Sequence, residues 1–237
     1  IHRQPDLSVA VFPIQAIGRR KLRQHLIGGA LRHNYTMLPA NVKRSDGGKG
    51  LLQQVGGEQL KEGDYVKVYV VDVRETEKGP RAMISRTHPD LVKRLFENEV
   101  PEIYDGVVEI KAVSREAGSR TKLAVLSHNP DVDAVGACIG ARGARVSNIV
   151  SELGGEKIDI VEYSDDIAKF IASALSPADV LSVEPAEDGS RSCRVTVPDN
   201  QLSLAIGNKG QNARLAAKLT GWKIDIKPES GFYGETE

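Results

Sequence analysis

Apolar positions in the chain change from helical spacing to strand spacing and back, beginning at residue 89. Leu91, Leu95 and Phe96 would share one face of a helix over 90–98, and Pro89 favours a helix start at that point. Runs of apolar residues bounded by turn residues then predict strands. In order, the expected elements are a strand over 107–113, a turn over 116–119, a strand over 121–126, a short helix ending near 139, a helix over 144–153 and a strand over 157–161.

The same succession of elements is predicted a second time. Ser164 is a favourable N-cap, and Asp165 and Asp166 are favourable in the first turn of the helix that would follow. The expected elements are a helix over 166–175, strands over 179–183 and 193–197, helices over 200–206 and 211–219, and a strand over 223–227. Both segments therefore have the order α-β-β-α-α-β.

Short sequence matches between the two segments indicate a duplicated domain. The matched pairs are 139–143 (IGARG) with 206–210 (IGNKG), 157–160 with 223–226 (both KIDI), and 118–120 with 189–191 (both GSR). The first pair lies 67 residues apart and the second pair 66, so a single one-residue gap relates them.

Before residue 89 the pattern indicates strands alone. Val66, Val68 and Val70 alternate with Lys67, Tyr69 and Val71, which predicts a half-buried strand. The other elements expected here are a turn over 78–80 and a second strand over 81–85.

Composition excludes several classes of protein. Apolar residues make up 40% and charged residues 27%, as in ordinary globular proteins. Cys138 and Cys193 have neither CxxC spacing nor a nearby histidine, so neither a disulfide framework nor a zinc site is indicated, and a reducing cytoplasm fits best. Neither a membrane-spanning apolar stretch nor a secretory signal is indicated. Because the chain begins with Ile1, we expect a fragment of a longer protein.

The net charge of zero hides an uneven distribution. The chain has 32 Lys and Arg and 32 Asp and Glu, which as an average argues against a polyanionic partner. Residues 1–60, however, hold nine basic and three acidic residues, and the windows 134–150 and 201–223 hold no acid. The segment 152–188 holds ten acids and two lysines. Charge is therefore sorted by segment, and the two acid-free windows contain the repeated glycine motif.

Each acid-free window places two glycines between predicted helices, at 140–143 and 207–210. Such a turn allows close approach to the backbone and directs the free N–H groups of the next helix outward, which suits a phosphate. Arg142 and Lys209, inside the turns, could neutralise that phosphate.

A single Gly-x-x-Gly is more often only a helix connection, and basic residues on a helix, such as Arg214 and Lys218 four apart, are usually a solvated face. Two copies favour binding, because both repeat the preceding Ile, the cation and the absence of acids.

The Ile-Gly-x-x-Gly turn between two helices is the signature of KH domains, and the order α-β-β-α-α-β resembles their type II form. In that family the turn clamps the backbone of about four nucleotides of single-stranded nucleic acid. By this resemblance, 140–143 and 207–210 are the clamps.

The chain also resembles the NusA family of bacterial transcription factors over about residues 61–227. The strings that carry the resemblance are 85–89 (SRTHP), 99–103 (EVPEI), 135–140 (VGACIG), 155–159 (GEKID), 201–207 (QLSLAIG) and 210–216 (GQNARLA). Members have a polymerase-binding domain, then an S1 domain, then two KH domains. The implied fold class is α+β, with an incomplete or divergent OB-type S1 β-barrel followed by two tandem type II KH domains.

The resemblance implies the RNA-binding part of a transcription elongation factor that binds nascent single-stranded RNA and modulates pausing, termination and antitermination. The implied partners are RNA polymerase, mainly through a missing N-terminal domain, and other Nus antitermination factors. A cytoplasmic monomer is expected, with no enzymatic activity, no cofactor, no catalytic residue and no metal site. The expected RNA-binding residues are Ile139, Gly140, Ala141, Arg142, Gly143, Arg145, Ile206, Gly207, Asn208, Lys209, Gly210, Gln211, Asn212, Arg214 and Lys218.

The expected domains are an unassigned basic segment over 1–35, an S1-like domain over 36–88, KH domains over 89–163 and 164–230, and a tail over 231–237. Residues 1–35 lack the strands that should open the barrel, and 42–57 reads as a polar, Gly-rich insertion. These segments could be a divergent strand pair, a basic arm or altered sequence.

In the S1-like part, Tyr65 and Tyr69 could either stack on bases or pack the barrel and its contact with the first KH domain. His88, before a proline at a strand-to-helix junction, is expected to be structural.

Two other functions compete with this interpretation. A phosphorolytic ribonuclease resembling polynucleotide phosphorylase also combines KH and S1 domains, but in the order KH then S1. The stretch 47–50 (GGKG) has neither the spacing nor the Ser or Thr of a P-loop. A ribosome-associated KH protein would be more basic. The acidic segment 152–188 could be a protein-contact surface or a solvated face.

Overall fold

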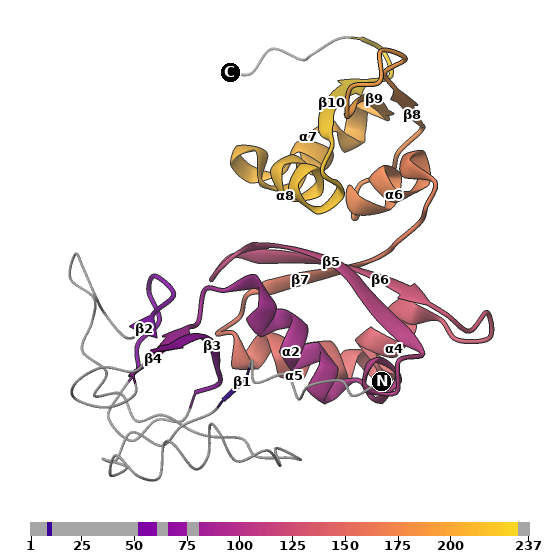
Figure 1. Cartoon of the computed structure of the whole chain (residues 1–237). Helices are drawn as coiled ribbons and strands as arrows, with labels where there is room; N and C mark the ends of the chain where they lie inside the picture. The colour runs from indigo at the N-terminus through magenta and orange to yellow at the C-terminus, as the bar shows by residue number, and fades with distance from the viewer. Residues whose placement is uncertain (1–8, 11–51, 61–65, 75–80, 232–237) are drawn as a thin grey trace.

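The structure, a computed structural model, describes residues 9–10, 52–60, 66–74 and 81–231, and contains the predicted order of elements twice (Figure 1). The first copy comprises α2 (Pro89–Glu99), α3 (Pro101–Tyr104), β5 (Val108–Glu116), β6 (Arg120–Ser127), α4 (Ala134–Ile139), α5 (Ala144–Glu152) and β7 (Lys157–Glu162). The second copy comprises α6 (Ile167–Ala174), β8 (Ser182–Pro185), β9 (Ser192–Val197), α7 (Leu202–Ile206), α8 (Gln211–Thr220) and β10 (Lys223–Pro228).

Each copy builds a three-stranded sheet of the same topology. The middle strand, β6 or β9, pairs antiparallel with the strand before it and parallel with the last strand of its copy. The predicted type II arrangement of the two copies is therefore confirmed. The longest helix in the described ranges, α2 with 11 residues, is too short to cross a membrane.

Three local predictions were inaccurate. The short helix α3 was not expected, and β8 begins at Ser182 rather than at 179. Ser164 is not the N-cap of α6; Asp166 is, because its carboxylate accepts hydrogen bonds from the N–H groups of Ala168 and Lys169. Ser164 Oγ instead accepts the N–H of Asp166, at 3.1 Å. The serine thus supports the cap from two residues upstream.

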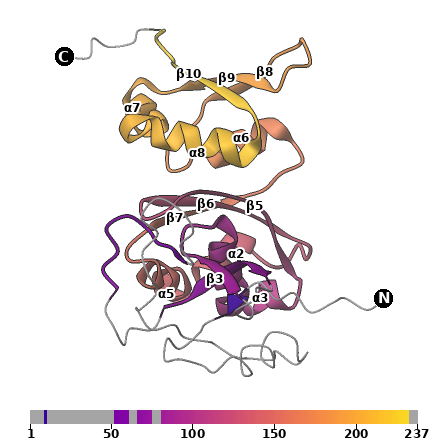
Figure 2. The same ribbon diagram turned by 60° about the vertical axis from the view of Figure 1, so that its left-hand side comes forward.

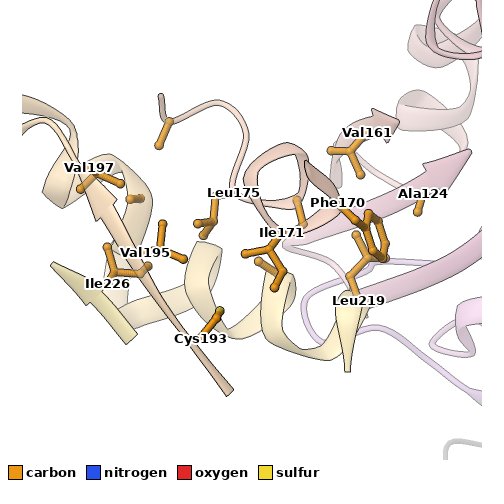
Figure 3. Packing of buried hydrophobic residues seen from close by; sticks show 14 residues of the cluster. Ala124, Val161, Phe170, Ile171, Leu175, Cys193, Val195, Val197, Leu219 and Ile226 are labelled. Atoms are coloured by element: carbon orange, nitrogen blue, oxygen red, sulfur yellow. The ribbon is translucent and has the colours of Figure 1, made fainter. Parts of the chain in front are cut away.

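The sheet of the first copy is buried on both of its faces. All five residues over 121–125 in β6 are buried, as in a strand covered on two sides. Leu123 and Val125 pack into the core beneath α2, α4 and α5. Ala124, which faces the other way, packs into a cluster that contains Phe170 of α6 and Leu219 of α8 (Figure 3). The two copies therefore share a hydrophobic core.

Helices of the second copy cover the outer face of the first sheet, as Figures 1 and 2 show from two directions. A buried lysine reinforces this contact, since Lys122 Nζ donates to Asp159 Oδ2 at 3.0 Å and to the Ser176 carbonyl of the second copy at 2.6 Å. Burial lowers the pKa of Lys122, against the opposing effect of Asp159. The contact between the copies is thus both apolar and hydrogen-bonded.

The corresponding face of the second sheet is polar. In β9, Cys193, Val195 and Val197 are buried, whereas Arg194 is exposed and Asp225 lies opposite it on β10. This alternation is typical of a sheet with one solvated face. The two copies have the same topology but different surfaces.

Strand pairing corrects one detail of the repeat. Arg120 lies opposite Lys157, and Ser192 lies opposite Lys223, so Ser192 is the structural equivalent of Arg120. The GSR match had equated Arg120 with Arg191. The sequence match is therefore shifted by one residue from the structural alignment. The shift arises because the turn before β9 is longer than the turn before β6.

The described strands before α2 are β1 (Val9–Ala10), β2 (Leu52–Gln53), β3 (Val68–Arg74) and β4 (Arg81–Ser85). They form an open sheet in the order β1-β3-β4-β2. The two strands predicted here are confirmed as the antiparallel pair β3 and β4, while the turn expected over 78–80 lies outside the described residues. Within the described ranges these strands do not close into a barrel, and 11–51, with most of the expected unassigned segment and insertion, lies outside them. The barrel stays a prediction.

Arg86 joins this sheet to the first copy. Its buried guanidinium donates to the Glu58 carboxylate, and to the side chain and the carbonyl of Glu152 in α5 at 3.1 and 2.8 Å. Tyr69 stacks on His88, with ring centroids 4.4 Å apart. Of its two expected roles, Tyr69 thus takes the contact with the KH domain, while Tyr65 lies outside the described residues. His88 caps α2 by accepting the N–H of Asp90.

A second buried ion pair fixes the turn between β5 and β6. Both carboxylate oxygens of Glu156 accept hydrogen bonds from Arg115 at 2.8 Å, and Glu156 also accepts the N–H of Gly118 and the hydroxyl of Thr121. Burial raises the pKa of Glu156, but these hydrogen bonds, that from Arg115 foremost, more than offset it and hold the pKa below its ordinary value.

We expect Glu156→Gln to lower the free energy of unfolding by about 3 kcal/mol, because Arg115 would be left as a buried, uncompensated charge. Urea denaturation measures this, with the exposed Glu162→Gln as the matched control. The stability that Glu156 contributes is present above the ordinary glutamate pKa of about 4.3 and is lost as the pH falls through its lower folded-state pKa. The variant should therefore lose less stability in acid, and a cost under about 1 kcal/mol would contradict this role.

Candidate nucleic-acid interface

The two glycine turns have the same backbone conformation. Each connects a short helix to a longer one, α4 to α5 and α7 to α8, through a single 3-10 turn. The first glycines, Gly140 and Gly207, have φ of 75° and 76°, and the second glycines, Gly143 and Gly210, have φ of 76° and 73°. The duplication seen in the sequence therefore reproduces a specific geometry.

The first glycine of each turn is required for two reasons: its φ angle is positive, and a Cβ atom would overlap neighbouring atoms. A Cβ on Gly207 would lie 2.8 Å from the backbone nitrogen of Asn212, and one on Gly140 would lie 2.6 Å from Cγ of Arg145. At Gly210, by contrast, the nearest such atom is 3.9 Å away. The first glycine lets the following helix pack directly against the turn, whereas the second supplies only the left-handed conformation.

The cation inside each turn is held in an unfavourable conformation. Arg142 and Lys209 have φ of 52° and 50° and are the only non-glycine residues with positive φ in the described ranges. Such a conformation costs about 1 kcal/mol. Both side chains are exposed. A strained, exposed cation at the same place in both copies points to a shared binding role.

Two of the residues predicted to bind RNA brace the turns from within the protein. Asn212 is 2% exposed, and its amide donates to the carbonyls of Ala205 and Leu175 at 3.1 and 2.9 Å. Its equivalent, Arg145, donates to the carbonyl of Ala137 at 2.6 Å and to Glu102 at 2.9 Å. Each ties the helix after the turn to the helix before it. Both side chains are thus engaged within the protein, and their direct contact with RNA stays a prediction.

The start of α8 is bonded to the first copy. Glu116, at the end of β5, accepts hydrogen bonds from Nε and Nη2 of Arg214 at 2.7 and 3.2 Å. It also accepts one from Gln211 Nε2 at 2.8 Å, and Gln211 donates in addition to Ser119 Oγ. These hydrogen bonds, first that from Arg214 and then that from Gln211, lower the pKa of Glu116, and Lys218 on the same helix adds to the effect.

The remaining predicted side chains lie at the surface, six of them at the turns, whereas Lys218 lies in the last turn of α8. Those classed as exposed are Ile139, Ala141, Arg142, Ile206, Asn208, Lys209 and Lys218. Leu204, which the sequence reasoning missed, is 43% exposed beside them on α7. A signal was available, because a five-residue helix of composition LSLAI has too many apolar residues to bury them all. The structure thus adds an exposed apolar side chain next to the second turn.

Four of the ten acids between the turns have roles within the fold. Glu152, Glu156 and Asp159 form ion pairs with cations of the first copy or the strands before it, and Asp166 caps α6. The other six acids are exposed, and the two roles expected for the segment, a solvated face or a protein-contact surface, stay predictions.

The described residues offer little for catalysis or metal binding. Within them, no three or more His, Cys, Asp or Glu side chains gather as a metal site would require. Burial raises the pKa of the Cys138 thiol to about 12, so it is a poor nucleophile. The arrangement at the turns supports binding of an extended anion.

The repeated topology and its two glycine turns define a protein with two tandem KH domains. The family model of the NusA-like first KH domain matches residues 86–163, and that of the NusA-like second KH domain matches 167–233. The chain belongs to the NusA family.

Curated relatives share extensive sequence with this chain, and each is named transcription termination/antitermination protein NusA. The protein of Halalkalibacterium halodurans is 59% identical over 76% of this chain and 47% of its own length. That of Bacillus subtilis is 60% identical over 75% and 48%, and that of Mycobacterium tuberculosis 55% identical over 80% and 54%. The chain thus spans about half the length of these relatives.

The two glycines of the second turn should differ in their tolerance of alanine. Gly210→Ala should cost about 1 kcal/mol of unfolding free energy, from its φ angle alone. Gly207→Ala should cost at least about 1 kcal/mol more, because its Cβ would overlap the backbone of Asn212. Chemical denaturation of both variants tests this, and equal costs would show that the close approach is relieved without penalty.

Proposed function

We propose that this chain is the RNA-binding part of a transcription elongation factor, which binds nascent single-stranded RNA and modulates pausing, termination and antitermination by RNA polymerase. The observation that carries the proposal is the repeated glycine turn with its strained, exposed cation. The names of the relatives, which state termination and antitermination, support the same assignment.

RNA would bind by its backbone at each turn. The backbone of each turn would meet the phosphates, with Arg142 or Lys209 adding charge. The apolar side chains Ile139, Ile206 and Leu204, exposed by 38%, 37% and 43%, would contact the bases. The shared core between the copies would hold both turns in one fixed relation, so that a single strand could meet both.

The remaining expectations belong to this proposal. RNA polymerase would be contacted mainly by a part of the longer protein outside this chain, and other Nus antitermination factors would complete the assembly. The factor would act in the cytoplasm as a monomer and without enzymatic activity. The proposed domains are those expected from the sequence, with KH domains over 89–163 and 164–230.

The test is to reverse the charge of the second turn without disturbing its fold. Asn208→Asp combined with Lys209→Asp changes two exposed side chains, and aspartate tolerates the left-handed conformation. We expect the affinity for a 12-nucleotide single-stranded RNA to fall at least about tenfold, because phosphate would meet two carboxylates.

The matched control is Ser190→Asp with Arg191→Asp, which makes the same charge change in the exposed turn before β9. The corresponding pair at the first turn is Ala141→Asp with Arg142→Asp. Equal affinity of the turn variants and the control would refute binding at the turns. Recovery of the RNA at full length after incubation with phosphate and Mg²⁺ is expected, and shortening would favour a phosphorolytic enzyme.

A further inference from the structure

The arginine next to the second turn is already bound to an anion of the first copy. The Nε and Nη2 atoms of Arg214 face the two carboxylate oxygens of Glu116, and its Nη1 donates to the carbonyl of Lys209 at 3.0 Å. The side chains of Arg214 and Glu116 are 45% and 25% exposed. Arg214 is therefore at the surface, beside the turn, but not available as a free cation.

Glu116 occupies the edge of the guanidinium with which arginine binds anions most strongly. Nε and Nη2 form the planar pair of donors with which arginine binds carboxylates and phosphates in bidentate fashion. An RNA phosphate that used the same edge would have to displace Glu116. The carboxylate thus takes the place that a phosphate of the ligand would take.

Within the described residues, the first turn has no such two-pronged pair, since Arg145 there meets Glu102 through Nη1 alone. The residue equivalent to Arg214 in the first copy is Ser147, which lies the same distance from Gly143 as Arg214 does from Gly210, 3.9 Å from the Cβ position. In the second copy, the turn equivalent to that of Glu116 carries Glu187, which is exposed and forms no ion pair with the described residues. The pair depends on the stacking of one copy on the other.

The contact between the copies does not depend on this pair. The hydrophobic cluster around Ala124, Phe170 and Leu219 and the buried Lys122 hold the copies together on their own. Glu116 can therefore be released from Arg214 without separating the two copies.

We propose that Glu116 is a specificity-determining residue of the second turn, an internal anion that competes with RNA phosphate for Arg214. A polyanion attracted by charge alone meets an arginine that Glu116 already neutralises, so Arg214 adds little to its binding free energy. A strand that also engages the backbone of the second turn and the cation of Lys209 gains enough binding free energy to bind. This inference rests on the proposed RNA-binding function and adds the means by which weak, purely electrostatic binding is suppressed.

Glu116→Gln tests the proposal in the 237-residue chain, since the amide keeps the shape of the side chain and removes its charge. We expect the affinity for the 12-nucleotide RNA to rise about three- to fivefold at low salt, because the released cation lies beside the phosphate. The plot of log affinity against log salt concentration should steepen by about 0.7, as one more counterion is released. Heparin should compete with the RNA more effectively than it does in the unsubstituted chain.

Two further variants separate this effect from general electrostatics. Glu187→Gln makes the same charge change in the equivalent turn of the second copy and should leave the affinity and the salt slope unchanged. In the double variant Glu116→Gln with Arg214→Gln, the gain should disappear and the affinity should return to about that of the unsubstituted chain. The unfolding free energy of each variant, measured in parallel, confirms that the fold is kept.

Weaker binding by Glu116→Gln would overturn the proposal and show that the carboxylate positions the start of α8 for RNA. A gain equal to that of Glu187→Gln, or one that persists without Arg214, would also overturn it. These outcomes differ from a failure of the proposed function, in which the unsubstituted chain and its variant at Asn208 and Lys209 bind RNA equally weakly.

Discussion

The burial of the first sheet on both faces is the constraint on which the rest of the structure depends. Ala124 in the middle of β6 leaves room for α6 and α8, and the buried Lys122 reaches across to the second copy. Because α8 begins directly after the second glycine turn, packing α8 on this sheet also places that turn. The position of the second turn is therefore determined by the first copy, and the ion pair of Glu116 with Arg214 is a consequence of the same packing.

The two turns reach one geometry with different side chains. In the first copy a long, charged residue, Arg145, reaches the carbonyl of the preceding helix and a surface carboxylate. In the second copy the short amide of Asn212 instead donates, from the interior, to the carbonyls of Ala205 and Leu175. Duplication has thus kept the backbone conformation, including the strained cation, while the support beneath it differs. This suggests that the shape of the turn matters more to binding than any particular neighbour.

Local sequence patterns were enough to predict most elements and both turns, because these depend on apolar spacing and on glycine. The patterns failed where a long-range contact decides the role of a residue. Asn212 and Arg214 look alike as polar residues on a helix face, yet one is buried and the other bonded to Glu116, nearly a hundred residues away. Neither role can be derived without knowing how the copies stack. The arrangement of the strands before α2 also depends on long-range contacts. Arg86 bonds both Glu58 and Glu152, which are far apart in the chain, and no local pattern predicts this.

The outer face of the second sheet is exposed, whereas that of the first sheet is covered. Where the first copy has Ala124 and the buried Lys122, the second has Thr196 and the exposed Arg194 at the equivalent positions. Each cation lies opposite an aspartate, Asp159 or Asp225, so the same arrangement of charges is buried in one copy and solvated in the other. The cost of taking such charges out of water therefore falls on the first copy, where the hydrogen bonds of Lys122 offset it.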